Sequence, residues 1–223
     1  MASGLKVHNT LSRKKEAFSP LSLPGKGKDE VWAYVCGITP YDFSHVGHGR
    51  SYTAFDVIRR YLEFSGYRVK HVQNFTDVDD KILKRASELN EDPLKLSKRF
   101  SDEYFTDIRR LGVRDAHVYP LISTHLKEIV TFVQRLLDKG MAYANESGVY
   151  FSVSKFKGYG KLSHQSLDQL KSGARVEVDE QKQAPEDFAL WKNAKPHEKL
   201  SWNPAQFGAK WTPCLAGRPG WHI

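Results

Sequence analysis

Hydrophobic and polar positions follow two different periods in the first third of the chain. An apolar run over Val31–Val35 predicts a buried strand, and 67–75 alternates apolar with basic or polar residues, as a half-buried strand does. Between them, apolar residues recur every three or four positions over 51–64, which predicts an amphipathic helix that stops near Gly66. Strand, helix and strand in this order predict a βαβ unit, and therefore a parallel sheet.

The pattern becomes helical and then mixed further along. Helices are predicted over 79–90, 92–111 and 126–140, with Pro93 near the start of the second. After them, 143–151 is typical of a hairpin, and 175–179 and 187–192 are typical of strands. We interpret this as an α/β chain in which 1–118 form a parallel-sheet domain, 119–216 a smaller α+β module, and 217–223 a segment returning to the first domain.

Composition narrows the class of protein. The 223 residues carry a net charge of +8, which fits a polyanionic partner such as nucleic acid or nucleotide phosphates, and equally a solvated basic surface. Two cysteines are too few for a disulfide framework and fit a reducing compartment. The chain shows no apolar run long enough for a membrane span and no signal-peptide stretch at its start, so we expect a cytoplasmic protein with no membrane partner.

The most informative stretch is 45–52, where His45 and His48 bracket a Val-Gly step between the first strand and the helix. A helix N-terminus attracts anions through its backbone N–H groups and its dipole, and Gly47 allows close approach of the backbone. Two histidines there can donate hydrogen bonds to phosphate oxygens, more strongly if charge develops on them. The stretch therefore predicts a phosphate site.

Cys36 and Thr76 fall just past the ends of the two predicted strands. Because ligands of parallel sheets bind beyond these ends, both residues can face one pocket. Cys36 has two interpretations, a buried structural cysteine or a thiolate ligand of zinc. One cysteine is not a zinc site, and His45, His48 and His222 lie at no metal-site spacing apart from the phosphate turn itself.

Acidic residues near these elements also have two interpretations. Asp79 and Asp80 are more simply explained as N-cap and first-turn carboxylates than as ligands. In the functional interpretation, Thr76 and Asp77 lie at the rim of a pocket and contact a polar small molecule. For 187–192, a packed strand with a basic tip is the preferred interpretation.

Together, several ordered segments closely resemble the N-terminal half of cysteinyl-tRNA synthetase, a class I aminoacyl-tRNA synthetase. The resemblance covers about 5–200 and resumes at 217–223; its segments are 9–13, 34–42 running into 45–50, 74–81, 173–176, 187–192 and 217–223. The Cys36-Gly37 step ahead of the H-x-G-H turn identifies the cysteine member of the class.

The resemblance implies a fold and an activity. The fold is the first half of a class I synthetase Rossmann-like parallel-sheet catalytic domain with an α+β connective insertion. The activity is ATP-dependent formation of cysteinyl-adenylate, with ATP as its magnesium complex, followed by transfer of the cysteinyl group to tRNA(Cys). His45, Gly47 and His48 match the "HIGH" motif that holds ATP phosphates, with Val46 in place of isoleucine.

The substrate pocket follows from the same resemblance. Gly37, Thr76 and Trp221 match positions that line the L-cysteine pocket, and Cys36 matches the first ligand of a zinc ion that recognises the substrate thiolate. A soft thiolate binds zinc directly, whereas a serine hydroxyl does so poorly. The second zinc-ligand cysteine, the later His and Glu ligands and the "KMSKS" loop of the family have no counterpart here, and Cys214 is no obvious substitute.

Three functions therefore remain open. The first is a cysteine–tRNA ligase present as an N-terminal fragment that is not expected to catalyse alone. The second is a non-catalytic truncated paralogue that binds tRNA or a partner. The third is an amide ligase that joins cysteine to an amino sugar, which the full match of the connective module disfavours.

Overall fold

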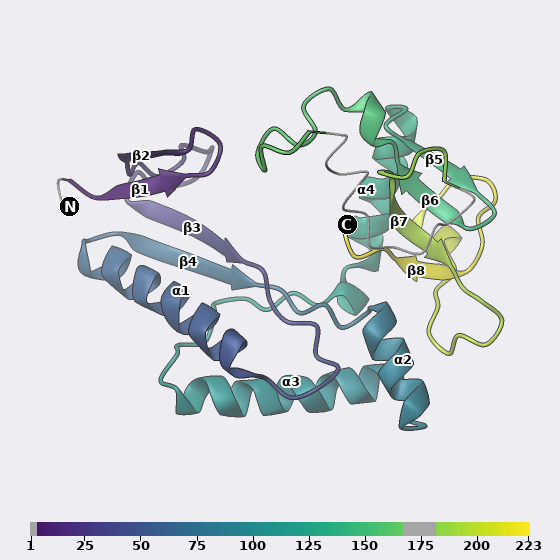
Figure 1. Ribbon diagram of the computed structural model, residues 1–223, viewed down its shortest axis with the longest axis horizontal. Coiled ribbons are helices and arrows are strands. Elements are labelled where there is room, and N and C mark those ends of the chain that lie inside the picture. The colour runs from purple at the N-terminus through teal and green to yellow at the C-terminus, as the bar shows by residue number, and fades with distance from the viewer. Residues whose placement is uncertain (1–3, 167–181) are drawn as a thin grey trace. The chain divides into compact units, whose positions relative to one another are not determined.

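The computed structural model describes residues 4–166 and 182–223, which form two compact units (Figure 1). The first unit contains the chain up to Asn9 together with Lys14–Thr124, and the second contains Thr10–Arg13 and His125–Ile223. The strand predicted over 175–179 and the family segment 173–176 lie outside the described residues. Over the described residues, no helix has both the length and the apolar character that a membrane crossing needs.

The first unit is built on the predicted βαβ unit. Strands β3 (Glu30–Val35) and β4 (Arg68–Gln73) pair in parallel, with Val31 opposite Val69, and helix α1 (Val46–Phe64) connects them. Gly66, after the helix, has a φ of +89°, a conformation in which glycine has no steric cost. The prediction of a parallel strand pair with a crossover helix is confirmed.

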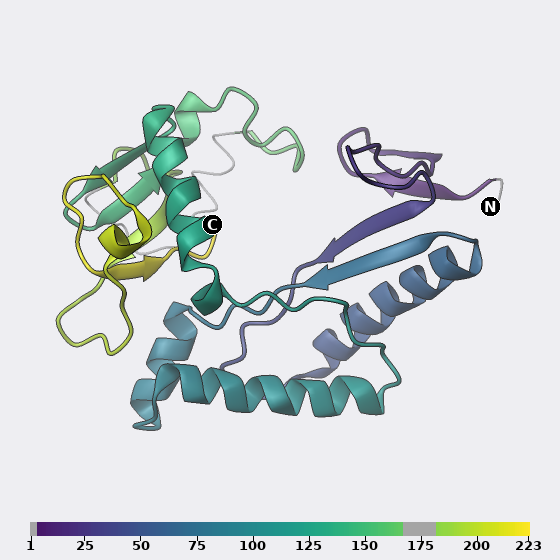
Figure 2. The same ribbon diagram turned by 180° about the vertical axis from the view of Figure 1, so that it is seen from behind.

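Helices cover one face of this parallel pair. Helices α2 (Asp80–Glu88) and α3 (Pro93–Arg110) follow β4, and α1 and α3 both lie on the same side of the two strands (Figure 2). Side chains from the strands, their ends and these two helices make the core: Val35, Ile38, Tyr52, Phe75, Tyr104 and Ile108. Val118 and Leu121 add parallel bridges to Val72 and Phe75, so the sheet continues at the β4 edge before the short helix η1 (Ile122–Thr124).

The helix α1 begins earlier than the apolar period predicted. The sequence predicted a helix over 51–64, with the H-x-G-H residues in a preceding turn, but these residues form the first turn of α1. His45 is the N-cap, and its side chain accepts a hydrogen bond from Gly47. A polar cap can start a helix ahead of the first apolar position, which the apolar period does not register.

An antiparallel hairpin, β1 (Lys6–Asn9) and β2 (Lys14–Ala17), precedes β3. The open end of the hairpin is closed by a hydrogen bond in which the Phe18 N–H donates to the Leu5 carbonyl at 2.8 Å. Leu5 and Phe18 then pack against a second apolar cluster that includes Val31 and Tyr67.

The second unit places helix α4 (Leu126–Asp138) with an antiparallel sheet of order β5-β6-β7-β8. The strands are β5 (Ala142–Asn145), β6 (Gly148–Phe151), β7 (Phe188–Asn193) and β8 (Gly217–Pro219), and the short helices are η2 (Val153–Lys155) and η3 (Pro204–Phe207). The hairpin predicted over 143–151 is β5-β6, and the strand predicted over 187–192 is β7, so both predictions are confirmed. Trp191 of β7 is fully buried.

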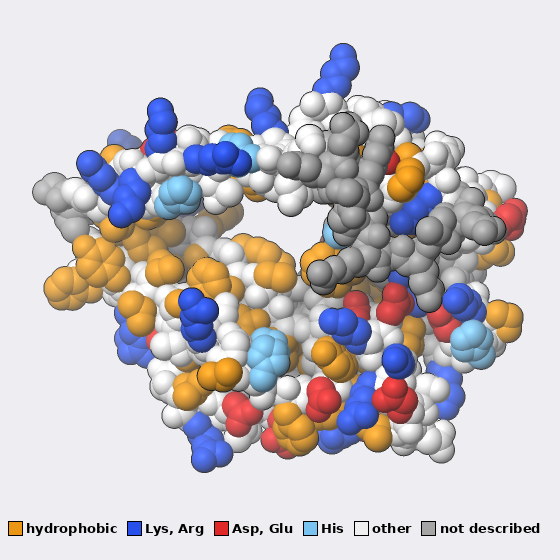
Figure 3. Space-filling view, viewed as in Figure 1, with side chains coloured by type: hydrophobic (Ala, Val, Ile, Leu, Met, Phe, Trp, Pro, Cys, Tyr) orange, Lys and Arg blue, Asp and Glu red, His pale blue; other side chains and the backbone are white. Residues whose placement is uncertain are grey.

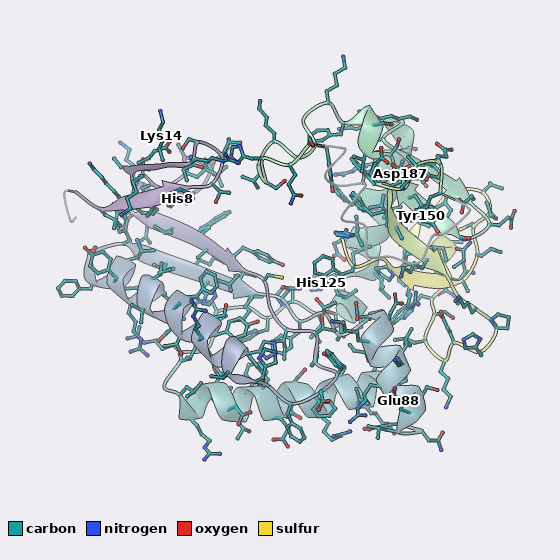
Figure 4. The ribbon with its side chains drawn as sticks, in the orientation of Figure 1. His8, Lys14, Glu88, His125, Tyr150 and Asp187 are labelled. Atoms are coloured by element: carbon teal, nitrogen blue, oxygen red, sulfur yellow. The ribbon has the colours of Figure 1, made fainter. Side chains whose placement is uncertain are left out.

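Two buried polar side chains of the second unit, Asp187 and Arg218, are bonded to groups of the same unit. The buried Asp187, labelled in Figure 4, accepts hydrogen bonds from the Val153 N–H at 2.9 Å and the Tyr143 hydroxyl at 3.0 Å. Arg218 of β8, equally buried, pairs with Glu198 at 3.1 Å. Residues 217–219 thus serve as a strand of this sheet, and the return of 217–223 to the first domain stays a prediction, as do the limits 1–118 and 119–216.

Candidate active site

The H-x-G-H turn is organised by hydrogen bonds between its own histidines and backbone. The Gly47 N–H donates to Nδ1 of His45 at 3.1 Å, and the His45 N–H donates to Nδ1 of His48 at 3.2 Å. The two imidazole rings stack with centroids 3.9 Å apart. A side chain at Gly47 would approach the His45 ring to 2.8 Å, so glycine at this position leaves room for the cap.

These bonds decide which ring nitrogens are available. A nitrogen that accepts an N–H carries no proton itself, so each neutral imidazole holds its proton on Nε2. His45 is exposed and His48 partly so. Burial, and secondly the neighbouring His45, lowers the pKa of His48, which keeps its ring neutral near pH 7. The turn therefore presents two neutral Nε2–H donors at the start of a helix.

The N-terminus of α1 also differs in charge from the other described helices. Asp79 caps α2 and Asp92 caps α3, while α4 has Glu128 in its first turn. Helix α1 has an imidazole cap and no acid in its first turn. Its partial positive charge is consequently not offset by a carboxylate of its own first turn, as an anion site requires.

Tyr52 connects this turn to the end of β3. Its ring stacks beside His48 with centroids 6.5 Å apart, and its hydroxyl donates to the carbonyl of Cys36 at 3.3 Å. Burial raises the pKa of Tyr52, so the phenol stays protonated and remains a donor. Tyr52 thus fixes the position of the histidine turn relative to the backbone of Cys36.

The two strand ends meet at a junction without space for side chains. A Cβ on Gly37 would overlap the carbonyl oxygen of Asn74, so only glycine fits. The Gly37 N–H donates to Oδ1 of Asn74 at 2.8 Å, and the Thr76 N–H donates to the Ile38 carbonyl at 2.9 Å. Asn74 also donates to Oγ1 of the buried Thr76 at 3.3 Å. The structure therefore brings Gly37 and Thr76 together.

Cys36 lies at this junction with its thiol exposed. The interpretation as a buried structural cysteine is therefore wrong. Among residues 4–166 and 182–223, no group of three His, Cys, Asp or Glu side chains gathers where it could hold a metal ion. A protein zinc site needs three or four ligands, so Cys36 supplies one donor and the described residues do not complete the set.

The acidic residues nearby have structural partners. Asp77 is buried and accepts hydrogen bonds from both the N–H and the hydroxyl of Ser123. Asp79 accepts from the Lys81 N–H at 2.9 Å as the cap of α2. Both carboxylates therefore stabilise the chain after β4, as the cap interpretation predicted for Asp79, and the place of Asp77 at a pocket rim stays a prediction.

The remaining predicted residues belong to the second unit. Trp221 is 61% exposed and stacks edge-on with His222, their centroids 4.8 Å apart. Cys214 is partly buried, and burial raises the pKa of its thiol. The place of Trp221 in a cysteine pocket stays a prediction.

Sequence reasoning missed Tyr52 and Asn74 as parts of this site. Tyr52 counted only as an apolar position of the helix, although its spacing of four from His48 places both on one helix face. Asn74 directly follows β4 and stands two positions before Thr76, and an asparagine just past a strand end commonly bonds neighbouring backbone.

Comparison with known proteins shows the family of the chain. A family model described as the catalytic domain of class I (C) tRNA synthetases matches residues 24–223. Proteins named cysteine–tRNA ligase from Methanococcus maripaludis strain C6 and Thermococcus kodakarensis are 51% and 52% identical over 98% and 99% of this chain. The chain spans 43% of the length of each.

A solved structure shows a partial likeness. Mycobacterium tuberculosis methionyl-tRNA synthetase bound by methionyl-adenylate matches 54% of this chain and 25% of its own, with a TM-score of 0.46 and 23% identity. The family match, by contrast, runs from residue 24 to residue 223 and includes the histidine turn and both strand ends. The resemblance to cysteinyl-tRNA synthetase is thus confirmed, and the chain belongs to the family of class I (C) tRNA synthetase catalytic domains.

Proposed function

We propose that this chain provides the ATP and cysteine sites of a cysteine–tRNA ligase. In the proposed reaction a carboxylate oxygen of L-cysteine attacks the α-phosphorus of ATP, the bond to the bridging oxygen breaks, and pyrophosphate leaves. A hydroxyl of the 3′-terminal ribose of tRNA(Cys) then attacks the carbonyl carbon of the adenylate, the ester bond forms, and AMP leaves. Family membership and the geometry of the histidine turn support this proposal.

The carrying observation is that both Nδ1 atoms of the turn are used internally. His45 and His48 can then act only through Nε2–H, as neutral donors toward the phosphates of ATP. Donors fixed before the reaction stabilise charge that develops on phosphoryl oxygens without reorganisation, and the loss of one such donor costs about 10²–10³-fold in rate. Magnesium would accompany ATP as part of the substrate.

The junction after β3 and β4 is the proposed cysteine site. Gly37 and Thr76 lie together there, and Trp221 is a further proposed lining residue. Cys36 stays a predicted zinc ligand whose task would be recognition of the substrate thiolate, and the described residues contain no group of three ligand side chains around it. The proposed activation step uses ATP and cysteine as substrates and the two histidines as hydrogen-bond donors. Two unpaired cysteines fit the cytoplasmic location that we propose.

The test is cysteine-dependent exchange between ATP and pyrophosphate, with serine as the control amino acid and zinc added. We expect His48→Ala to reduce exchange about 10²–10³-fold relative to the parent and Cys36→Ser to remove the preference for cysteine. The 223-residue chain by itself is not expected to turn over, so the same variants are also made in a chimera. In it, this chain replaces the matching 43% of the Methanococcus maripaludis relative.

A folded chimera that binds ATP but shows no exchange would contradict the proposal. Equal exchange with serine and cysteine would contradict the cysteine assignment alone. Exchange by the unextended chain would show that these residues suffice for activation.

A second candidate function is a non-catalytic module that binds tRNA or a partner. The net charge of +8 favours it, because positive charge attracts the phosphates of RNA and this attraction needs no catalytic site. It predicts salt-sensitive RNA binding together with a chimera that activates no amino acid.

A further inference from the structure

The β1–β2 hairpin concentrates lysines on one face. In its antiparallel register Lys6 lies opposite Ala17 and His8 opposite Lys15, so Lys6, His8 and Lys15 share a face, which we call the basic face. All three side chains are exposed. Glu16 lies on the opposite face, where it accepts a hydrogen bond from Asn9 at 2.8 Å. The basic face therefore contains no carboxylate.

The space-filling view of Figure 3 shows basic side chains on this hairpin. Lys, Arg and His side chains gather over β1 and β2 at the upper left of Figure 3, and His8 and Lys14 mark the two strands in Figure 4. Residues two apart on one strand are about 7 Å apart, and directly opposite residues are about 5 Å apart. The two lysines and the His8 imidazole therefore lie close together on this face.

The lysines of the basic face differ from the arginines elsewhere in the first unit. Seven of those arginines have carboxylate partners within 4.0 Å: Arg59, Arg60, Arg68, Arg85, Arg99, Arg109 and Arg114. Lys6 and Lys15 have no such partner among the described residues. An unneutralised basic face attracts a polyanion, whereas paired cations do not.

The hairpin is also held in place by its base. The Phe18 ring meets the Tyr67 ring edge-on, with centroids 5.4 Å apart, and the Phe18 N–H bonds to Leu5. Both residues pack on the apolar cluster at the start of β3. The basic face is therefore a presented surface of the first unit and not a free tail.

We infer that the basic face of the hairpin, Lys6, His8 and Lys15, binds the sugar-phosphate backbone of the RNA substrate. The choice of RNA as the polyanion rests on the proposed function, in which tRNA is the acceptor. Contacts to phosphates position an RNA and carry no base information, so the effect of losing them is uniform across RNA sequences.

The experiment uses the 223-residue chain and a fluorescently labelled tRNA(Cys) transcript, with binding followed by anisotropy between 50 and 200 mM salt. The test variant is Lys6→Gln with Lys15→Gln. The matched control is Lys84→Gln with Lys95→Gln, which removes the same charge from exposed positions on α2 and α3. Circular dichroism and thermal melting check that both variants fold like the parent.

We expect the test variant to bind roughly tenfold more weakly, and the slope of log affinity against log salt to become shallower by about 2, since each phosphate contact contributes about 0.9. The control variant should stay within about twofold of the parent. An unrelated tRNA should show the same loss. No binding by the parent at 50 mM salt, or an equal loss in both variants, would overturn the inference.

Binding of ATP separates this inference from the proposed function. The test variant should bind ATP as the parent does, because its two lysines lie outside the histidine turn. A parent chain that binds RNA through the basic face but binds no ATP would contradict the proposed function and leave the hairpin surface in place.

Discussion

The parallel pair β3-β4 and the antiparallel sheet β5-β6-β7-β8 use their polar residues in different ways. At the ends of β3 and β4, backbone and Asn74 close the junction, while the Cys36 thiol is left exposed and the histidine turn presents Nε2–H donors. In the antiparallel sheet, Asp187 and the Arg218–Glu198 pair are buried and bonded inside the fold. The difference teaches that a polar residue at a strand end indicates a ligand site only when the fold does not consume its hydrogen bonds.

Replacement of Gly37 at the junction of β3 and β4 should have the largest effect on stability and ligand binding. In Gly37→Ala the new Cβ overlaps the Asn74 carbonyl, a backbone group that cannot rotate away, so we expect destabilisation of at least about 3 kcal/mol and loss of ATP binding. Urea denaturation measures the first and equilibrium dialysis the second. Gly158→Ala is the control, since its Cβ would meet Phe156 at an ordinary 3.6 Å. A stable Gly37→Ala protein would show that the junction is looser than described.

Arg218→Met tests the buried pair of the second unit. Glu198, whose side chain is 12% exposed, would then lose the cation that pairs with its partly buried charge, and the free energy of unfolding should fall by about 3 kcal/mol. Lys98→Met removes an exposed pair with Asp102 on α3 and should cost less than about 0.5 kcal/mol. Similar losses in both variants would mean that burial of the Arg218 pair has no energetic consequence.

Asp77 and Asp187 test whether a buried aspartate stabilises the fold or binds substrate. Asp77→Asn and Asp187→Asn each weaken buried hydrogen bonds to backbone N–H and hydroxyl donors, and each should destabilise its unit by about 1–3 kcal/mol. Denaturant midpoints give the measurement. If Asp77→Asn keeps full stability and loses cysteine or ATP binding, Asp77 is a pocket residue after all.

The smallest expected effect concerns pH. His71 of β4 is buried with no hydrogen-bond partner for either ring nitrogen, and burial, then Arg59 and His117, lowers its pKa from the ordinary value of 6.5, against a smaller opposing effect of Asp56. The unfolded chain therefore takes up a proton first, and stability should fall as the pH drops below about 6.5, by at most about 1.4 kcal/mol per pH unit for this group.

His71→Leu should flatten that fall between pH 7 and 5, because the variant has no imidazole to protonate. His8→Gln, an exposed histidine in β1, serves as the control. Identical pH profiles for the parent and His71→Leu would contradict this origin of the acid sensitivity.

Much of the fold follows from the sequence because its periods are clear. The alternation over 67–75 and the helical spacing over 51–64 were enough to predict β4, α1 and their parallel connection. The true start of α1 was missed because a capping histidine, and not an apolar residue, decides it. Local signals thus predict elements better than their ends.

The site was predictable in part. The histidine turn and the neighbouring positions of Cys36 and Thr76 follow from the order of strand, turn and helix. The ring nitrogens used by the cap, the Tyr52 bond to Cys36 and the closed contact of Gly37 with Asn74 depend on distances between elements, which no local pattern contains. The bonds from Ser123 to Asp77 could not be predicted for the same reason, since Ser123 lies far along the chain.

The most direct test of the central claim is a titration of the isotope-labelled chain with magnesium ATP, followed through the imidazole nitrogens of its histidines. The account predicts that His45 and His48 carry their protons on Nε2 and that these two rings, with the amides of the first turn of α1, shift on binding, while His8 and His71 do not. Protons on Nδ1 of the turn, or no shift at saturating ATP, would contradict it.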